Sequence, residues 1–436
     1  MSNLLAARVQ MGFTLGFHML FAAFGVGFPL LMLVAERIAL RGGGDHYMAL
    51  ARTWGRANAL LFAVGAVSGT ALSFELGLLW PGFMRLTGST IGVGFATEAF
   101  AFFVEAIFIG LYLYGWNRLS PRAHWWTGVP IALSGAASAA LVIAVDAWMQ
   151  HPVGGGALLR GGVVSPLKAL FANPHWFVMA THATIACYAA TAFTVAAVYA
   201  WGMLRGRRTA AHRAGLRIAM VLATGATLLM PFTGDLAGKA VARFQPTKLA
   251  AMESQFRSEA AAPLRIGGLP DPARRTVRYD IEIPGGLSWL AYGSGSATVR
   301  GLDAVPPADW PDVPVTHVAF QLMVGSGTLM VLVALLYWWS RRRTASEGLG
   351  RLALLGVLLG APLAFLALET GWVVTEVGRQ PWIVYGLQRT ADAVTPVPGL
   401  LLYLVGYGAL YLLLGTTVVL LLRGVERAVP AVERAA

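Results

Sequence analysis

Residues 352–374 read LALLGVLLGAPLAFLALETGWVV and lead, through Thr375, into Glu376-Val377-Gly378-Arg379-Gln380-Pro381-Trp382. The apolar run is long enough to cross a membrane as a helix, which needs about 20 residues. An ionisable group at the edge of the hydrocarbon costs several kcal/mol unless it is paired, bound to a cofactor or facing water. The segment alone leaves two interpretations open. Arg379 and Trp382 could anchor an interfacial loop at the headgroups, or the acid, base and aromatic could belong to a functional site.

Composition places the whole chain in the membrane class. Hydrophobic residues make up 57% of the 436, charged residues make up 12%, and the mean hydropathy is +0.63, so the chain is interpreted as an integral membrane protein. We expect an all-α fold of nine transmembrane helices. Their predicted ranges are 12–36, 58–80, 95–116, 126–148, 175–203, 216–237, 316–339, 352–374 and 399–422. The first run is too long for a signal peptide, so it is interpreted as a retained helix.

Arginine collects in every second connection of this predicted topology. Basic clusters follow the first, third, fifth and seventh spans, from Arg37 and Arg41 to Arg341, Arg342 and Arg343. Because cytoplasmic loops are the basic ones, we expect the N-terminus outside and the C-terminus in the cytoplasm, as an odd number of helices requires. The net charge of +12 is mostly this bias, and it gives no reason to expect nucleic acid as a partner.

The predicted spans divide the chain into three parts. Residues 1–237 hold the first six helices, 238–315 form one long external loop, and 316–436 hold the last three helices and a short cytoplasmic tail. A loop of that length is usually functional or disordered. Within it we predict a strand at Thr276–Ile283 and, at 246–256, an amphipathic helix packed on the outer face of the bundle. Cys187 is the only cysteine, so no disulfide can form within the chain.

A few residues with chemistry lie inside the spans, and their predicted depths agree. The residues expected in the outer leaflet are His18, Glu98, His182, Met323 and Glu376. Imidazole and thioether are haem-iron ligands, and His with Met on one iron forms a closed electron-transfer centre. Haem binding is therefore one interpretation. A histidine that bonds a neighbouring helix and a methionine that only packs are the alternatives for single residues.

Several segments together carry a resemblance to a known family. They are Glu105 within Phe-Phe-Val-Glu-Ala, Ala147-Trp148-Met149-Gln150, Lys248-Leu-Ala-Ala-Met-Glu253, Phe320-Gln321-Leu322-Met323-Val324-Gly325, and Glu376 with Gly378-Arg379-Gln380-Pro381-Trp382. In this order they resemble subunit I of the cytochrome bd-type quinol oxidases, in the short-loop form that includes the cyanide-insensitive branch. The resemblance runs from Arg8 to about Leu422. It implies a nine-helix subunit whose quinol-binding loop joins helices six and seven.

The resemblance implies roles for the haem-binding residues. His182 and Met323 would be the axial ligands of a low-spin haem b, and His18 and Glu376 would each hold one of two high-spin haems. One of these would be haem b and the other haem d or a further haem b, and which residue takes which haem stays open. Arg379 would pair with a haem propionate or with Glu376, and Trp382 belongs to the same cofactor-binding segment.

The resemblance also implies how substrate and protons are handled. Lys248 and Glu253 match positions tied to quinol binding and oxidation, whereas Glu98 and Glu105 match acids assigned to proton delivery. A spacing of seven puts these two acids on one helix face. The implied activity is quinol oxidation at the external face and reduction of O2 to water with cytoplasmic protons, which generates proton motive force without pumping. The implied setting is the bacterial inner membrane, with a second membrane subunit and sometimes a small single-helix third subunit.

Two residues depart from the family pattern. Gln321 stands where many members have Arg, which bears on the potential of the low-spin haem, and Asp146 stands where Asn is expected. The short loop leaves ubiquinol and menaquinol both open as substrates.

Two other classes of protein compete with this interpretation. A dihaem membrane cytochrome that exchanges electrons with quinone but does not reduce oxygen would use His182 and Met323, yet it would leave His18 and Glu376 without a task. A secondary transporter should show an internal repeat, and we recognise none in the sequence.

Overall fold

The computed structural model describes residues 2–343 and 349–435, with side chains as far as residue 423. Within this part of the chain, nine helices are long and apolar enough to cross a membrane, which confirms the predicted fold class. They are α1 (Asn3–Ile38), α2 (Asp45–Leu79), α3 (Pro81–Gly115), α4 (Pro121–Gln150), α7 (Trp176–Leu204), α8 (Ala210–Phe244), α11 (Val313–Arg343), α12 (Arg351–Val377) and α14 (Leu400–Ala435). The side chains of the predicted tail beyond residue 423 lie outside the described part.

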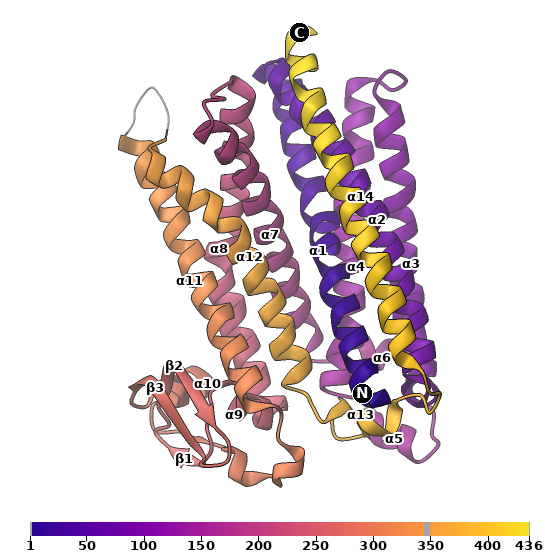
Figure 1. Cartoon of the computed structure of the whole chain (residues 1–436), viewed down its shortest axis with the longest axis vertical. Coiled ribbons are helices and arrows are strands. Elements are labelled where there is room, and N and C mark those ends of the chain that lie inside the picture. Colours follow the sequence, from indigo (N-terminus) through magenta and orange to yellow (C-terminus); the bar gives the residue numbers. More distant parts are fainter. Residues whose placement is uncertain (1, 344–348, 436) are drawn as a thin grey trace.

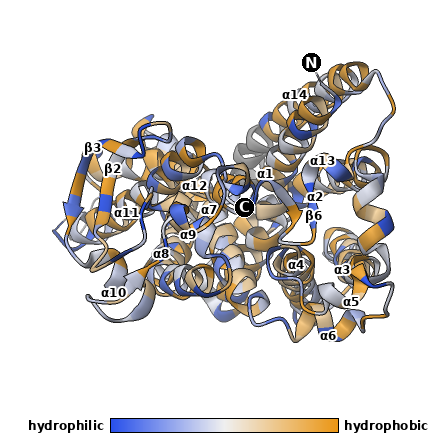
Figure 2. Cartoon of the chain, turned by 90° about the horizontal axis from the view of Figure 1, so that it is seen from below, coloured by the Kyte–Doolittle hydropathy of each residue, from blue (hydrophilic) through white to orange (hydrophobic). Residues whose placement is uncertain are grey.

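The long helices form two four-membered groups and one outer helix (Figure 1). In the first bundle, α1 and α3 each pack on both α2 and α4. In the second bundle, α7 and α11 each pack on both α8 and α12, so these two helices stand diagonally opposite each other. Figure 2 shows the two groups end-on. α1 and α4 of the first bundle contact α7 of the second, and α14 lies outside against α1 and α2.

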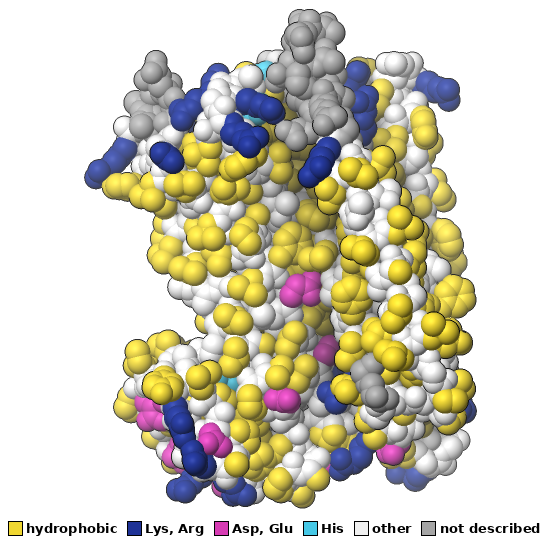
Figure 3. All heavy atoms as spheres, in the orientation of Figure 1, with side chains coloured by type: hydrophobic (Ala, Val, Ile, Leu, Met, Phe, Trp, Pro, Cys, Tyr) yellow, Lys and Arg dark blue, Asp and Glu magenta, His cyan; other side chains and the backbone are white. Residues whose placement is uncertain are grey.

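The two ends of the bundles differ in charge. Figure 3 shows Lys and Arg side chains gathered at the upper end, above a broad band of hydrophobic side chains. We call this end the basic face; it carries the connections from α1 to α2, α3 to α4, α7 to α8 and α11 to α12. The opposite end, which we call the loop face, carries residues 245–312 and the N-terminus (Figure 1).

Short elements cover the loop face, apart from η1 (Ala39–Gly43), which ends α1. They are α5 (Gly155–Leu159), α6 (Pro166–Phe171), α9 (Pro246–Met252), β1 (Glu259–Ala260), β2 (Leu264–Asp271), β3 (Thr276–Ile283), α10 (Gly286–Tyr292), β4 (Thr298–Val299), η2 (Leu302–Ala304), η3 (Pro307–Asp309), β5 (Trp382–Val384), β6 (Gln388–Arg389) and α13 (Thr390–Ala393). The predicted strand Thr276–Ile283 is confirmed as β3. It pairs with β2 in an antiparallel hairpin, in register from Leu264 opposite Ile283 to Asp271 opposite Thr276.

Local sequence sets where the long helices begin. Pro81 opens α3 and Pro121 opens α4, because proline fits the first helical turn, where its missing N–H is not needed. Ser120 caps α4 by accepting a hydrogen bond from the Ala123 amide at 3.3 Å. These starts come earlier than the hydropathy pattern predicts, so α3 runs for 35 residues.

Small residues bring the two bundles together. A Cβ added at Gly27 of α1 would overlap the side chain of Thr191 on α7, whose hydroxyl donates to the Ala23 carbonyl at 2.8 Å. Within the first bundle, a Cβ added at Gly135 of α4 would lie 2.9 Å from the Gly25 carbonyl oxygen of α1. Helix backbones in a membrane approach closely where side chains are this small.

A buried polar cluster ties three helices of the first bundle near the basic face. Glu36 of α1 lies 2.7 Å from His124 of α4 and accepts a hydrogen bond from the Tyr112 hydroxyl of α3 at 2.8 Å. The other ring nitrogen of His124 lies 2.9 Å from the Tyr112 carbonyl oxygen. All three side chains are at most 2% exposed, and their mutual bonds satisfy groups that would otherwise destabilise a buried position.

The helix predicted at 246–256 is wrong in extent and in setting. α9 ends at Met252, and every residue from Lys248 to Met252 is buried. Leu249 packs with Leu287 and Val299, while Ala250 and Ala251 pack with Phe256 and Val313. The rest of the loop therefore folds over α9 and covers the side that a surface helix would expose to water.

Candidate functional site

His182 and Met323 come from diagonally opposite helices of the second bundle, α7 and α11. The Nδ1 atom of His182 lies 3.0 Å from the Thr233 hydroxyl of α8, and that hydroxyl donates to the Met230 carbonyl at 3.2 Å. The hydroxyl must then accept from Nδ1–H, which places the lone pair of the ring on Nε2. Across the bundle, the sulfur of Met323 rests against Gly371 of α12, where a Cβ would lie 3.1 Å away.

His18 in the first bundle repeats this arrangement. Its Nδ1 lies 3.1 Å from the Ser68 hydroxyl of α2, which donates to the Val64 carbonyl at 2.9 Å. Nδ1 therefore carries the proton, and Nε2 keeps the lone pair that a metal needs. Gly69 lies beside the ring, where a Cβ would stand 3.0 Å from Cε1 of His18. Each predicted histidine ligand thus has a hydroxyl partner on a neighbouring helix and a glycine next to its imidazole.

Two other buried histidines lack a lone pair for a metal. His124 bonds Glu36 and the Tyr112 carbonyl through its two ring nitrogens. His317 bonds the carbonyl oxygens of Met252 and Gly267 in the same way. Hydrogen bonding therefore separates His18 and His182 from these histidines.

Glu376 lies at the loop-face end of α12 and is paired with Arg379. Arg379 is only 2% exposed, and its second terminal nitrogen donates to Asp146 of α4 at 2.9 Å. The Glu376 side chain is 30% exposed, so its carboxylate remains reachable. Trp382 follows on β5, where the Arg389 guanidinium lies 4.8 Å from its ring centroid. Asp146 was noted in the sequence only as a departure from a pattern, and the structure makes it a direct partner of Arg379.

Lys248 points from α9 into the same cluster. Its ammonium group donates to the Gln150 side-chain oxygen at 2.5 Å and to the Thr375 carbonyl at 2.9 Å. Lys248 is 3% exposed, and burial, followed by the nearby charge of Arg379, lowers the pKa of its ammonium group. We predicted this residue outside the bundle on a surface helix. It lies instead beneath the loop and bonds Thr375, the residue before the haem-ligand candidate Glu376.

Glu253 is buried immediately after α9. Its side chain is 3% exposed, and its Oε2 atom has no hydrogen-bond partner among the described residues. Burial raises the pKa of Glu253 to about 8, and the charge of Arg265 opposes this only in part. Lys248 and Glu253 are thus both buried on the loop side of the membrane bundles, each with its pKa moved towards neutrality.

Glu98 lies deeper than the sequence suggested, and Glu105 lies two turns beyond it on α3. Glu98 is seventeen residues from either end of α3, or about 25 Å along the helix, so its predicted place near the external end is wrong. Its carboxylate accepts a hydrogen bond from Ser138 of α4 at 2.6 Å. Glu105 is 4% exposed and faces the close approach of Gly25 and Gly135. The two acids share a face of α3, as predicted from their spacing.

Three residues near these sites escaped the sequence analysis, and a fourth, Gln150, was named there without a role. Ser138 donates to Glu98, and Gln150 accepts from Lys248, but hydropathy gives no signal for such partners. Glu369 lies on the same face of α12 as Glu376 and close to Gly16 of α1, with one buried carboxylate oxygen unpartnered; an acid inside an apolar run was the signal that could have found it. His175 lies near Lys248, whose charge together with burial lowers the pKa of His175 to about 4.

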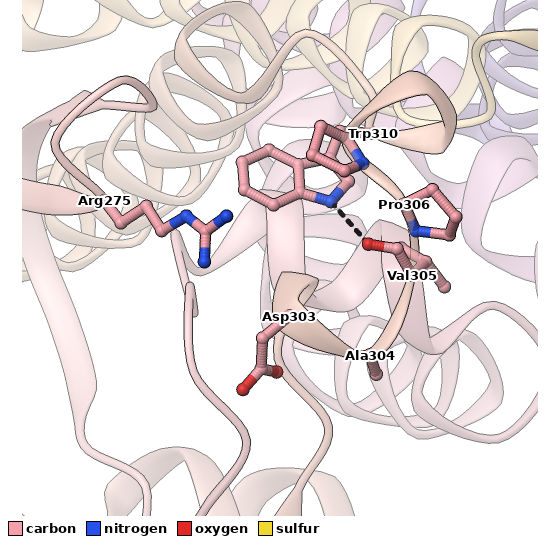
Figure 4. A pocket seen from close by; sticks show the side chains of 7 residues that line it. Arg275, Asp303, Ala304, Val305, Pro306 and Trp310 are labelled. Carbon is pink, nitrogen blue, oxygen red and sulfur yellow. Dashed lines mark hydrogen bonds between the residues drawn. The ribbon is translucent and has the colours of Figure 1, made fainter.

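An open pocket of about 380 Å³ lies elsewhere in the loop. Arg275, Asp303, Pro306 and Trp310 are among its lining residues, and the Arg275 guanidinium approaches the Trp310 ring (Figure 4). The Trp310 indole is fixed by hydrogen bonds to the Leu302 and Val305 carbonyl oxygens. Neither Lys248 nor Glu253 lines this pocket, so it is separate from the predicted donor site.

Comparisons with known proteins agree with this geometry. The family described as "Cytochrome bd terminal oxidase subunit I" matches residues 6–430. A Bacillus subtilis (strain 168) protein provisionally named cytochrome bd menaquinol oxidase subunit I is 36% identical, and the alignment covers 97% of this chain and 96% of that protein. A second protein of that organism, named cytochrome bd ubiquinol oxidase subunit 1, is 31% identical over 97% of this chain and 93% of its own length. The solved structure of the bd oxidase from Geobacillus thermodenitrificans superposes with a TM-score of 0.90 at 36% identity, covering 98% of both chains.

Proposed function

Because the chain belongs to the cytochrome bd terminal oxidase subunit I family, we propose which of its residues hold the haems, receive the quinol and move protons. Family membership makes the chain a subunit of a terminal quinol oxidase. Such a subunit is a multi-pass membrane protein that carries haem, oxidises quinol and works with a second subunit. The alternative of a dihaem cytochrome without oxygen chemistry is not favoured by this membership.

His182 and Met323 are the proposed axial ligands of a low-spin haem b. Their diagonal placement, the lone pair on His182 Nε2 and the glycine beside Met323 suit a group held between two helices. His18 and Glu376 are the proposed protein ligands of two high-spin haems, one haem b and one haem d or a further haem b. Ser68 orients His18, and Arg379 offsets the charge of Glu376. When bound, the haems supply electron transfer and the reduction of oxygen to water.

The loop of residues 238–315, into which α8 extends as far as Phe244, is the proposed quinol-binding loop, with Lys248 and Glu253 as its reactive side chains. An ammonium group has three N–H donors, and Gln150 and Thr375 take two of them from Lys248. The third can bind an oxygen of the quinol. Glu253 is the proposed acceptor of a quinol proton, since its raised pKa makes its carboxylate a stronger base than an ordinary one near neutral pH.

Glu105 and Glu98 are the proposed carriers of protons through the first bundle. Glu105 lies nearer the basic face and Glu98 is midway along α3, so the pair covers two turns of the inner half of the helix. Ser138 holds the Glu98 carboxylate at 2.6 Å. We place the basic face in the cytoplasm, following the charge rule for membrane helices, so protons for water formation enter there. Quinol protons leave at the loop face, and charge is separated without a pump.

The proposed setting is the inner membrane of a bacterium, which the bacterial relatives support. The substrate is a ubiquinol or a menaquinol, and a small single-helix subunit is a further proposed partner.

One observation carries the site assignment most directly: both predicted histidine ligands are fixed by a hydroxyl in the tautomer that leaves Nε2 for a metal. The test is a reduced-minus-oxidised spectrum of the purified complex, combined with oxygen consumption on added quinol. We expect one low-spin and two high-spin haem signals together with turnover. A spectrum with low-spin haem b alone would contradict the assignment of His18 and Glu376.

A further inference from the structure

His317 lies where the quinol-binding loop meets α11, and its side chain is fully buried. Its Nδ1 atom is 2.7 Å from the Met252 carbonyl oxygen at the end of α9. Its Nε2 atom is 2.9 Å from the Gly267 carbonyl oxygen on β2. One side chain of α11 therefore joins two segments of the loop that are far apart in sequence.

Both ring nitrogens of His317 thus lie within hydrogen-bond distance of a carbonyl oxygen. Carbonyl oxygens only accept hydrogen bonds, so the imidazole is the donor in this contact. The opposite ring orientation would place a ring carbon 2.7 Å from the Met252 carbonyl oxygen, well inside ordinary contact. The two carbonyls therefore fix the orientation of the ring.

A second residue of α11 holds the same strand. Gln321, one turn after His317, accepts from the Gly267 amide at 3.0 Å and donates to the Arg265 carbonyl at 3.0 Å. Gly267 and Gly268 have φ values of +71° and +104°, a region that only glycine adopts readily. The register of β2 on β3 is constant through this stretch, with Gly267 opposite Asp280 and Leu269 opposite Arg278.

The surrounding charges leave one acid near this contact without a complete set of partners. Arg265 of β2 is paired with Asp280 and Glu282 of β3. On α8, Lys239 is paired with Asp235 and the Arg243 guanidinium lies 5.3 Å from the Phe244 ring centroid, and at the end of α12 Glu376 is paired with Arg379. On α9, Lys248 is bonded to Gln150 and Thr375. Glu253, directly after Met252, is the remaining acid, and its Oε2 atom has no hydrogen-bond partner among the described side chains.

We propose that His317 is a positioning residue of the quinol-oxidising site, which through its two ring nitrogens holds the segment of Met252 and Glu253 against α11 and β2. The proposal rests on the donor role given above to Lys248 and Glu253. Loss of the imidazole removes these contacts, so the segment loosens and the quinol binds more weakly. The reaction at the haems, on other helices, is not altered by this change.

The test measures oxygen consumption by the purified complex at several quinol concentrations. For His317→Gln we expect a KM for quinol about tenfold higher than in the wild type, the loss expected from one hydrogen bond, at an unchanged kcat. The haem spectrum should be that of the wild type.

Two control variants separate this role from others. Asp303→Ala removes a different contact of the same loop, the bonds from Ser258, and should keep the KM of the wild type. Glu253→Gln should lower kcat. If Glu253→Gln and Lys248→Ala both turn over normally, the donor site itself is wrong. If those variants are impaired but His317→Gln keeps the wild-type KM, only the role of His317 is wrong.

A second measurement guards against a variant that fails to fold. Amide hydrogen exchange around Met252 and Gly267 should be faster in His317→Gln than in the wild type, whereas the helices of the first bundle should exchange equally in both. Equal exchange of the two proteins around Met252 and Gly267 would overturn the proposal.

Discussion

Single hydroxyl groups decide which histidines of this protein can serve as ligands. Ser68 and Thr233 each donate to a carbonyl one turn back on their own helix, so each can only accept from the imidazole beside it. This fixes His18 and His182 with a lone pair on Nε2. At His317 both ring nitrogens face carbonyl oxygens of the protein, so no ligand position remains. We therefore assign the metal-binding role from hydrogen-bond partners, which burial alone does not provide.

The first prediction tests Met323 as a haem ligand. Met323→Leu keeps the volume of the side chain but deletes the thioether, so the low-spin haem should become high-spin or show a lower potential. A redox titration followed by optical spectroscopy measures both. Met330→Leu is the matched control, because Met330 lies two turns further on α11 and is buried among hydrophobic side chains. A low-spin spectrum and potential unchanged in Met323→Leu would rule out this ligand.

A second prediction concerns the buried carboxyl of Glu253. The folded protein raises its pKa to about 8, so it binds this proton more tightly than the unfolded chain does. Stability should then fall as the pH rises from about 4.5 to about 8, by at most about 1.4 kcal/mol per pH unit. Glu253→Gln removes the titration. In thermal unfolding of the solubilised complex, the Tm of the variant relative to that of the wild type should therefore rise from pH 5 to pH 8. Parallel curves for the two proteins would contradict the assignment.

At the scale of elements, α12 stands between two sites. Gly371 gives room to Met323 of α11, while Glu369 approaches Gly16 of α1. The sequence predicted this helix well, because its apolar run is uninterrupted over 352–374. It also predicted β3, whose alternation is local. It missed the true start of α3, because a Gly- and Thr-containing stretch lowers hydropathy between Pro81 and Phe95 without interrupting the helix, and the depth of Glu98 was misjudged with it.

A third prediction follows from the contact between α1 and α7. Gly27→Ala adds a methyl group where the Thr191 side chain already lies, so the helices must separate, at a cost of roughly 1–3 kcal/mol. We expect a clearly lower Tm. Gly12→Ala on the same helix meets no atom within 4 Å and should leave the Tm unchanged or slightly raise it. Equal Tm values for the two variants would show that the close approach does not matter for stability.

At the scale of the whole molecule, different tasks belong to different bundles. The acids of the proposed proton route lie in the first bundle, while the proposed ligands of the low-spin haem lie in the second. Arg379 joins the two by pairing with Glu376 on one side and Asp146 of α4 on the other. The family resemblance of the sequence predicted most of these residues. It could not predict the cluster of Asp146, Gln150 and Lys248, because these residues lie about a hundred or more positions along the chain from groups that they contact.

The fourth prediction separates the proton route from haem binding. Glu105→Gln keeps the shape of the side chain in the narrow space between Gly25 and Gly135 but cannot titrate. Turnover should fall steeply at full haem content, and more than in Glu98→Gln, because Glu105 is only 4% exposed and water cannot easily replace it. Haem content and oxygen consumption are measured on one purified sample. Loss of haem would instead favour a structural role, and wild-type turnover would exclude both roles.

His317 and Gln321 of α11 both bond Gly267, so part of what fixes the conformation of the loop lies outside the loop. In a chimera that exchanges residues 245–312 between two oxidases, the grafted segment would meet a foreign α11. A donor site transplanted without positions 317 and 321 should therefore lose its selectivity for a quinone head group, even though every residue that touches the substrate has been transferred. Substrate preference in such hybrids would depend on α11 as much as on the loop.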